Sequence, residues 1–328
     1  MARALARLVE TENRRMMREH GLSLKVTAIV DSRGSCSDDN GLDLRIALQA
    51  KEKYGSIGKY PAHGQMGSAA KQEIFEREAD VIVETTPTNY ENGEPGLSNI
   101  QNALSRGRHV VTTNKGPLAL AMPALLELAN HKKAKFRFSG TVGAGTPFLE
   151  LGKTCLHGER ILFIRGILNG TSNYILSRME ESGTGLEEAL AEAKKKGYAE
   201  ADLEYDLSGM DTAAKIVILS NWVMGIPLTL RQVRFSGISK IPSQKLRKAR
   251  TSGAGVRLIG RLQDSRASVG LEELGPADPL FVSGMMNAVT YQTEHAGQLT
   301  LTGPGAGGEE TASAIVRDLV EIRRTYSA

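Results

Sequence analysis

The sequence predicts an α/β protein with two regions: a parallel-sheet region, followed by an α+β region whose open sheet is mostly antiparallel. Three observations predict this. Up to about residue 131, short apolar strands alternate with amphipathic helices, as is typical of a parallel sheet. After residues 135–139 the pattern changes, and late strands follow one another closely, which favours antiparallel pairing. The length of 328 residues is sufficient for two cores.

The first region opens on a helix over residues 2–19, with apolar residues on one face and charged residues on the other. A strand over 25–30 ends at Asp31 and leads into a loop, rich in Gly, Ser and Asp, that runs to Gly41. The same alternation predicts the remaining elements, which are a helix over 42–54, strands over 80–84 and 109–112, and helices over 97–105 and 117–129.

The second region mixes the two kinds of element. We expect helices over 149–155, 172–181, 186–196 and 211–223, and strands over 161–167, 256–261, 268–272, 288–293 and 298–302. A last amphipathic helix over 311–326 needs a surface to pack on. We therefore assign residues 1–135 with 303–328 to the first domain, and residues 136–302 to the second.

Composition excludes several classes of protein. Lys and Arg number 41 and Asp and Glu 37, a net charge of +4, but the basic residues are scattered and aromatic residues make up only 5%, so we expect no nucleic-acid partner. Two cysteines, Cys36 and Cys155, form neither a disulfide framework nor a metal motif, which favours a cytoplasmic location. The longest apolar stretch, 216–226, is too short to span a bilayer, and we expect no membrane anchor.

A strand that ends in an acidic residue, as the strand before Asp31 does, is typical of the second strand of a dinucleotide-binding domain. We therefore expect the first strand and its glycine turn to precede Met1. The glycines of Gly303-x-Gly305-x-x-Gly308 do not form that turn. A dinucleotide-binding turn lies in a βαβ unit with an acidic residue about 20 residues further on, whereas here one predicted helix follows the glycines. Its backbone can still approach an anion at a helix N-terminus, or it is a flexible turn.

Polar residues follow two neighbouring strands. Thr85 and Thr86 end the first strand, and Asn114 and Lys115 end the second. In open α/β sheets ligands bind beyond the carboxyl ends of the strands, so we expect these residues to face one crevice. The alternative is that Asn114 caps the helix before Pro117, which does not account for Lys115.

Asp211 and Lys215 are four residues apart on a predicted helix, so they share a face and can interact. Taken alone, the pair is equally compatible with a solvated surface ion pair, which contributes little to stability.

Five motifs together occur in the order and spacing of homoserine dehydrogenases, which the chain resembles over nearly its whole length. They are GTVGAGTP over 140–147, NGTSNYIL over 169–176, GYAEAD over 197–202, GMDTAAK over 209–215 and GPGAGG over 303–308. The resemblance implies a Rossmann-like nucleotide-binding domain, a substrate and dimerisation domain, and a C-terminal helix that returns to the first domain. It also implies the NAD(P)-dependent interconversion of L-homoserine and L-aspartate 4-semialdehyde in threonine, methionine and isoleucine biosynthesis, by a homodimer.

Oxidation of a primary alcohol needs a base at its hydroxyl while hydride leaves the carbon. The resemblance identifies Lys215 as the acid/base and Lys115 as a second lysine, and two ammonium groups side by side favour the neutral form of one. The resemblance also implies that the carboxylates of Glu200 and Asp211 bind the ammonium end of the substrate and the local water. The same resemblance implies that Asp206 and Thr171 also contact the substrate.

The cofactor residues expected on the same grounds are Asp31, Arg33, Thr85, Thr86, Asn114, Lys115, Gly303 and Gly305. Asp31 favours the ribose 2′-hydroxyl of NAD, whereas Arg33 would meet the 2′-phosphate of NADP, and the sequence leaves both open.

The GTVGAGTP segment resembles a loop that binds a monovalent cation in this family. The resemblance implies a sodium ion on the backbone carbonyls of Val142, Ala144 and Thr146. Ser139 stands where some members supply a carboxylate, and its hydroxyl offers sodium less charge. The alternative is a glycine-rich turn before the helix that follows Pro147.

Two rival interpretations remain. Aspartate-semialdehyde and glyceraldehyde-phosphate type dehydrogenases need an activated cysteine. Cys155 has a helical setting, and we expect it to be a buried structural thiol. The other rival is a non-catalytic nucleotide-binding or regulatory paralogue, which the absence of the glycine turn from the sequence suggests.

Overall fold

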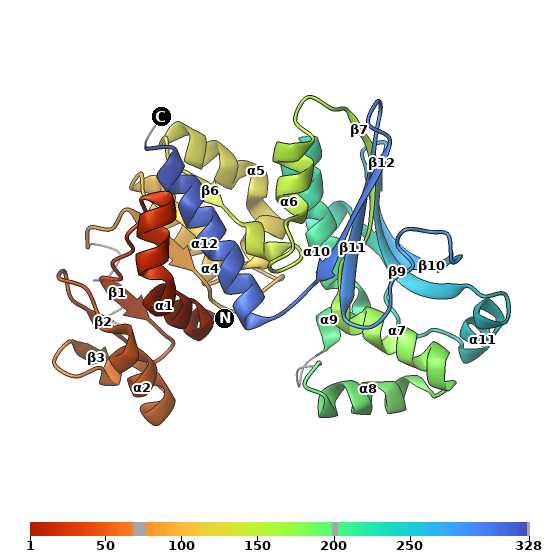
Figure 1. Cartoon of the computed structure of the whole chain (residues 1–328), viewed down its shortest axis with the longest axis horizontal. Helices are drawn as coiled ribbons and strands as arrows, with labels where there is room; N and C mark the ends of the chain where they lie inside the picture. Colours follow the sequence, from red (N-terminus) through yellow and green to blue (C-terminus); the bar gives the residue numbers. More distant parts are fainter. Residues whose placement is uncertain (68–76, 199–202, 327–328) are drawn as a thin grey trace.

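The computed structural model describes residues 1–67, 77–198 and 203–326, and it contains three sheets. The first region holds two small sheets, of strand order β1-β2-β3 and β4-β5-β6. The second holds a six-stranded sheet of order β12-β11-β7-β9-β10-β8. Figure 1 shows the two regions side by side, with the C-terminal helix α12 lying beside the N-terminal helix α1. The mixed α/β class is the predicted one.

The parallel sheet carries the alternation expected from the sequence. Its strands are β4 (Val81–Glu84), β5 (His109–Thr112) and β6 (Phe136–Arg137), all parallel. Helices α4 (Gly96–Ser105) and α5 (Lys115–His131) connect them and pack on each other. Ile100, Leu104, Leu118 and Met122 are almost fully buried there, because α4 packs on the sheet and α5 packs on α4 and on α10 of the second region. The carboxyl ends of β4 and β5 therefore lie at the same edge.

The small antiparallel sheet corrects one prediction. The loop expected after Asp31 contains a strand, β2 (Gly34–Ser37), which pairs with both β1 (Ala28–Val30) and β3 (Gly64–Met66). No β-branched residue marks β2 in the sequence. A tight turn forms instead because the Asp31 carboxylate accepts the backbone N–H groups of Arg33 and Gly34.

Two helices and a short turn complete this part of the chain. They are α1 (Ala2–His20), α2 (Leu44–Tyr54) and a 3-10 turn over Ile57–Lys59. Helix α2 begins where the Asp43 carboxylate accepts the N–H groups of Arg45 and Ile46.

The second region is built on its six-stranded sheet, whose pairs are antiparallel except for β8 with β10. The strands are β7 (Ile161–Ile167), β8 (Arg234–Phe235), β9 (Gly255–Gln263), β10 (Arg266–Leu274), β11 (Met286–Thr293) and β12 (Gln298–Pro304). The helices are α7 (Gly170–Ser182), α8 (Leu186–Lys195), α9 (Glu204–Ser208), α10 (Met210–Leu219) and α11 (Ser243–Thr251). Helices α7 and α10 pack against β9, and α10 also packs against α5 of the first region.

Two predicted helices end in π-helical turns. Residues 149–155 form α6 (Phe148–Glu150) and a π-turn over Leu151–Cys155, and α10 passes into a π-turn over Ser220–Met224. Cys155, the last residue of the first π-turn, is exposed and not buried as expected, and Cys36 is the buried thiol.

Helix α12 (Gly308–Arg324) packs against α1 and β5. Ile315 and Leu319 of α12 join Met16 and Val111 in one apolar cluster. Arg323 Nε also donates to the Gly21 carbonyl at 3.0 Å. This is the surface that the amphipathic pattern of α12 required. Among the helices that the structure describes, none is both long and apolar enough to cross a membrane.

Candidate active site

Two lysines and one aspartate form a buried cluster where α10 meets α5. Asp211 and Lys215 lie one turn apart on α10, and each is only 6% exposed. Lys215 Nζ is 2.8 Å from Asp211 Oδ2, and Lys115 Nζ, from the first residue of α5, is 3.3 Å from Asp211 Oδ1. The burial rules out the solvated surface pair that the spacing alone allowed.

Charge compensation governs this cluster. Burial alone would raise the pKa of Asp211, but the charges of Lys215 and Lys115 outweigh burial and hold that pKa well below its usual range. The carboxylate lies between the two ammonium groups and balances their charge. Lys215 Nζ also donates to the Leu168 carbonyl at 2.5 Å.

The ends of β4 and β5 are tied together by a buried carboxylate. Glu84 is 3% exposed and accepts the Thr112 hydroxyl at 3.0 Å. The same carboxylate accepts the backbone N–H of Thr86 at 2.8 Å and the Thr86 hydroxyl. The two strand ends are therefore held at a fixed separation.

Asn114 caps α5 and joins it to the end of β4. Its Oδ1 accepts the Gly116 N–H at 3.0 Å, and its Nδ2 donates to the Thr86 hydroxyl at 3.1 Å. The residue is only 1% exposed. The capping alternative thus describes Asn114, whereas Lys115 extends to Asp211. Thr85 remains half-buried at the strand end.

One of the expected substrate residues, Asp206, is linked to the same cluster through Asn169. Asn169 Nδ2 donates to Asp206 Oδ1 at 2.6 Å and to Asp211 Oδ2 at 2.9 Å. Burial, and then the charge of Asp211, raise the pKa of Asp206 above its usual value. Thr171 donates to the Tyr198 carbonyl at 3.1 Å, just before residues 199–202. Glu200 lies outside the described residues.

Sequence reasoning missed Tyr90. This residue follows β4, is 5% exposed, and directs its hydroxyl to Asp211 Oδ1 at 3.3 Å. Its ring meets the ring of Tyr205 edge to face, with centroids 4.9 Å apart. Asn169 was visible as part of a motif, but nothing in the local sequence connects Tyr90 with an aspartate 121 residues later.

The expected cofactor residue Asp31 lies in another environment. Oδ2 accepts Lys51 Nζ at 2.7 Å and the Ile57 N–H at 2.8 Å, and Oδ1 accepts the Ser56 hydroxyl at 3.2 Å. Burial opposes the charge, but the hydrogen bonds from Lys51 and backbone N–H groups outweigh it and lower the pKa to about 2. Both oxygens are thus occupied by the chain itself, whereas Arg33 is exposed.

The glycines at 303 and 305 permit close packing. A Cβ at Gly303 would lie 2.2 Å from Thr146 Oγ1, and one at Gly305 would lie 2.1 Å from the Asn287 side chain. Thr146 Oγ1 also donates to the Pro304 carbonyl at 3.0 Å. The segment over 303–308 therefore lies directly against the expected cation loop.

Two carboxylates converge on the hydroxyl of Ser139. Glu150 and Asp318 both contact Ser139 Oγ, the latter at 2.5 Å, and the Ser139 N–H donates to Asp318 Oδ2 at 2.9 Å. Burial raises the pKa of Asp318 to about 7. Arg317 Nη1 donates to the Gly145 carbonyl at 3.0 Å. In the loop itself, Ala144 adopts a φ of 51°, and the Thr146 carbonyl accepts the Phe148 N–H at 2.8 Å.

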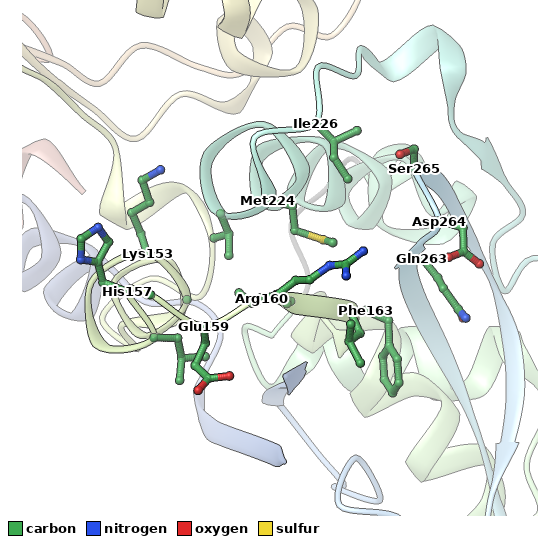
Figure 2. Close-up of a pocket in the computed structure, with 16 residues that line it drawn as sticks. Lys153, His157, Glu159, Arg160, Phe163, Met224, Ile226, Gln263, Asp264 and Ser265 are labelled. Carbon is green, nitrogen blue, oxygen red and sulfur yellow. The ribbon is translucent and has the colours of Figure 1, made fainter. Parts of the chain in front are cut away.

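A cavity of about 620 Å³ lies away from this cluster, beside the two π-helical turns and the start of β7. Figure 2 shows Arg160 extending into it between Met224 and Phe163. Neither lysine of the buried cluster, nor Asp211, lines it. The cavity and the charged cluster at the strand ends are therefore separate features of the structure.

Comparison with known proteins identifies the family. Residues 147–320 match the family model described as homoserine dehydrogenase. The homoserine dehydrogenase of Methanocaldococcus jannaschii is 46% identical over 91% of this chain and 88% of its own length. The NAD(+)-dependent homoserine dehydrogenase of Pseudomonas canavaninivorans is 39% identical over 98% and 93%.

A structure of a hyperthermophilic archaeal homoserine dehydrogenase in complex with NADPH has a TM-score of 0.85 and 30% identity, over 100% of this chain and 95% of that one. The five motifs, the buried lysine cluster and these relatives agree. The chain belongs to the homoserine dehydrogenase family of NAD(P)-dependent oxidoreductases.

Proposed function

We propose that this chain interconverts L-homoserine and L-aspartate 4-semialdehyde with NAD(P) as the hydride carrier, and that Lys215 and Lys115 are its catalytic residues. One observation carries the assignment of residues. Two lysines from different regions meet on one buried carboxylate, next to the carboxyl ends of parallel strands, where ligands of open α/β sheets bind.

The strand ends suit a nicotinamide nucleotide. Thr85 and Lys115 are partly exposed there, and their hydroxyl and ammonium groups are suitable hydrogen-bond donors to such a ligand. Thr86 and Asn114 hold the two strand ends in register behind them, and Gly303 and Gly305 complete this side of the nucleotide region in our assignment. NAD(P)+, when bound, accepts the hydride from the substrate's alcohol carbon.

Lys215 is placed to exchange the proton. A lysine ammonium has three N–H groups, and those of Lys215 include one bond to the Leu168 carbonyl and one to Asp211 Oδ2. The third position on the nitrogen is left for the substrate hydroxyl. In oxidation the neutral amine accepts the hydroxyl proton, and in reduction the ammonium donates it to the carbonyl oxygen. Lys115, with its side chain 23% exposed, stabilises the developing charge on that oxygen.

We propose that carboxylate side chains bind the ammonium end of the substrate. The carboxylate of Asp211 already balances the charges of two lysines. We therefore propose that its main role is to position these lysines and the local water. We assign Asp206, which accepts one hydrogen bond from Asn169, and Glu200 to the ammonium group. Thr171, whose hydroxyl donates to the Tyr198 carbonyl, is a further substrate contact in this proposal.

For the cofactor, we favour NADP over NAD. Both oxygens of Asp31 accept hydrogen bonds from the chain, which leaves it poorly disposed to bind a ribose hydroxyl. The exposed guanidinium of Arg33 suits a 2′-phosphate. Initial rates with NADP+ and NAD+ at equal concentrations test this, and a higher kcat/KM with NAD+ would contradict it.

A sodium ion at the carbonyls of Val142, Ala144 and Thr146 remains part of the proposal. Ser139 brings no charge, but the carboxylates of Glu150 and Asp318 meet at its hydroxyl, so negative charge is present beside the loop. Replacing sodium with tetramethylammonium at constant ionic strength should then lower the activity.

The remaining assignments follow the family resemblance. We propose that residues 1–135 with 303–328 form the nucleotide-binding domain, that residues 136–302 form the substrate domain, and that the protein is a cytoplasmic homodimer. Light scattering on the purified protein tests the dimer, and a monomeric mass would contradict it.

The decisive experiment is an assay in both directions. Purified protein should reduce NADP+ or NAD+ with L-homoserine and oxidise the reduced nucleotide with L-aspartate 4-semialdehyde. Nucleotide binding without turnover would instead support the non-catalytic paralogue. Ethanol, which has the primary alcohol but lacks the amino-acid end, is the matched control substrate and should not react.

A further inference from the structure

Asp211 receives hydrogen bonds or ion pairs from two sides. Asn169 and Lys215 of the second region bind Oδ2, at 2.9 and 2.8 Å. Lys115 and Tyr90 of the first region approach Oδ1, both at 3.3 Å. The two groups from the first region are the charged Lys115 and the neutral Tyr90. The proposed reaction gives Tyr90 no role so far.

The position of Tyr90 is fixed by packing. The residue is 5% exposed, and its ring lies edge to face against Tyr205 of α9. The ionisable groups that act on its hydroxyl are Asp211, Asp206 and Tyr205. Burial, and then the negative charge of Asp211, raise the pKa of Tyr90 well above its usual value, so the phenol stays protonated and donates.

We infer that Tyr90 is a positioning residue for the proposed reaction, and that it acts through Asp211. Its hydroxyl holds Oδ1 on the Lys115 side, which leaves Oδ2 to orient Lys215 toward the substrate hydroxyl. The inference rests on the proposed function. Without the phenol, the carboxylate can rotate, and it holds Lys215 less firmly toward the substrate hydroxyl.

The test compares Tyr90→Phe with Tyr205→Phe. Both remove one hydroxyl from the same pair of rings and keep the aromatic contact. For Tyr90→Phe we expect kcat for homoserine oxidation to fall roughly tenfold, the scale of a lost hydrogen bond to a charged group. We also expect the pH profile of kcat to differ from the parent's, because the lost hydroxyl donates to the carboxylate that contacts both lysines, while KM for the nucleotide stays unchanged. Tyr205→Phe should retain the parent's kcat and pH profile.

A second pair of variants shows whether Tyr90 acts through Asp211. In an Asp211→Asn background, adding Tyr90→Phe should change neither kcat nor the urea midpoint further, because the charged acceptor is already gone. Additive effects would overturn the inference, as would an active parent whose Tyr90→Phe variant keeps the parental kcat and pH profile. A parent protein without turnover would refute the proposed function itself, and the role of Tyr90 with it.

Discussion

Two aspartate–lysine pairs of almost equal length have different settings in this molecule. Asp31 and Lys51 approach to 2.7 Å in the small antiparallel sheet, and Asp211 and Lys215 to 2.8 Å on α10. The Lys51 side chain is 35% exposed, whereas that of Lys215 is 7% exposed. The main partners of Asp31, apart from Lys51, are backbone N–H groups within 26 residues, whereas Asp211 gathers side chains from both regions.

The difference separates a pair held mainly by local backbone donors from one held by side chains of both regions, and we propose that only the second takes part in catalysis. Local backbone donors that surround Asp31 hold a turn in shape, and its lysine adds one more donor. Around Asp211, the donors are side chains from both regions of the molecule. The distance within the two pairs is almost the same, whereas the origin of the surrounding donors differs.

The largest expected effect is that of Lys215→Ala. It should lower kcat by about 100-fold or more, because it removes the group that takes up the proton. The fold should persist, since Asp211 keeps Lys115, Asn169 and Tyr90 as partners. Steady-state kinetics and circular dichroism measure both. A kcat within threefold of the parent would remove Lys215 from the mechanism and favour Lys115 as the base.

Glu200→Ala should raise KM for homoserine roughly tenfold, because a charged contact to the ammonium end acts in the ground and transition states alike. Its kcat should change much less than that of Lys215→Ala. Glu200→Gln, which keeps the shape, is the matched control for charge. An unchanged KM for homoserine with a raised KM for the nucleotide would show that Glu200 contributes to nucleotide binding and not to homoserine binding.

Lys51→Ala provides the contrast in the other pair. We expect it to lower the free energy of unfolding by about 1 kcal/mol, because the ion pair is partly exposed and Asp31 keeps its backbone donors. Urea denaturation measures the loss, and kcat should remain at the parental value. A fall in kcat comparable to that of Lys215→Ala would erase the distinction between the two pairs.

An effect of similar size is the dependence of stability on acid. The pKa of Asp31 is lowered to about 2 in the folded protein, so its stabilisation is complete above the unfolded pKa of about 4. It is lost as the pH falls from about 4 to about 2, and amounts to about 1 kcal/mol because the pair is partly exposed. Asp31→Asn should remove this part of the acid sensitivity in urea titrations. Identical slopes in parent and variant would contradict it.

Periodicity predicted most of the elements, because regular burial leaves regular patterns. The strands over 109–112 and 161–167 have the predicted bounds, and the six-stranded sheet lies in the second region as expected. The strand before Asp31, expected in the parallel sheet, instead pairs in a separate antiparallel sheet. The strand Gly34–Ser37 was missed because its residues have no apolar alternation, and a side-chain turn at Asp31 creates it. The π-turns were missed because they preserve a helical pattern in the sequence.

The site was predicted in part for the same reason. A spacing of four residues placed Asp211 and Lys215 on one face, and chain order placed Lys115 at a strand end. The burial of this pair depends on the packing of α5 against α10, which no local sequence pattern shows. The contact of Tyr90 depends on the same packing.

The pairing of α12 with α1 also constrains how the protein is made. Arg323 binds the carbonyl of Gly21 across 302 residues of chain, and Met16 and Leu22 complete their apolar cluster only with α12. During synthesis, α1 therefore leaves the ribosome long before its partner exists. The part of its apolar face that α12 covers stays accessible to chaperones and to other nascent chains until the whole second region has been translated. Contacts of such long sequence separation also slow folding, so docking of α12 should be a late step.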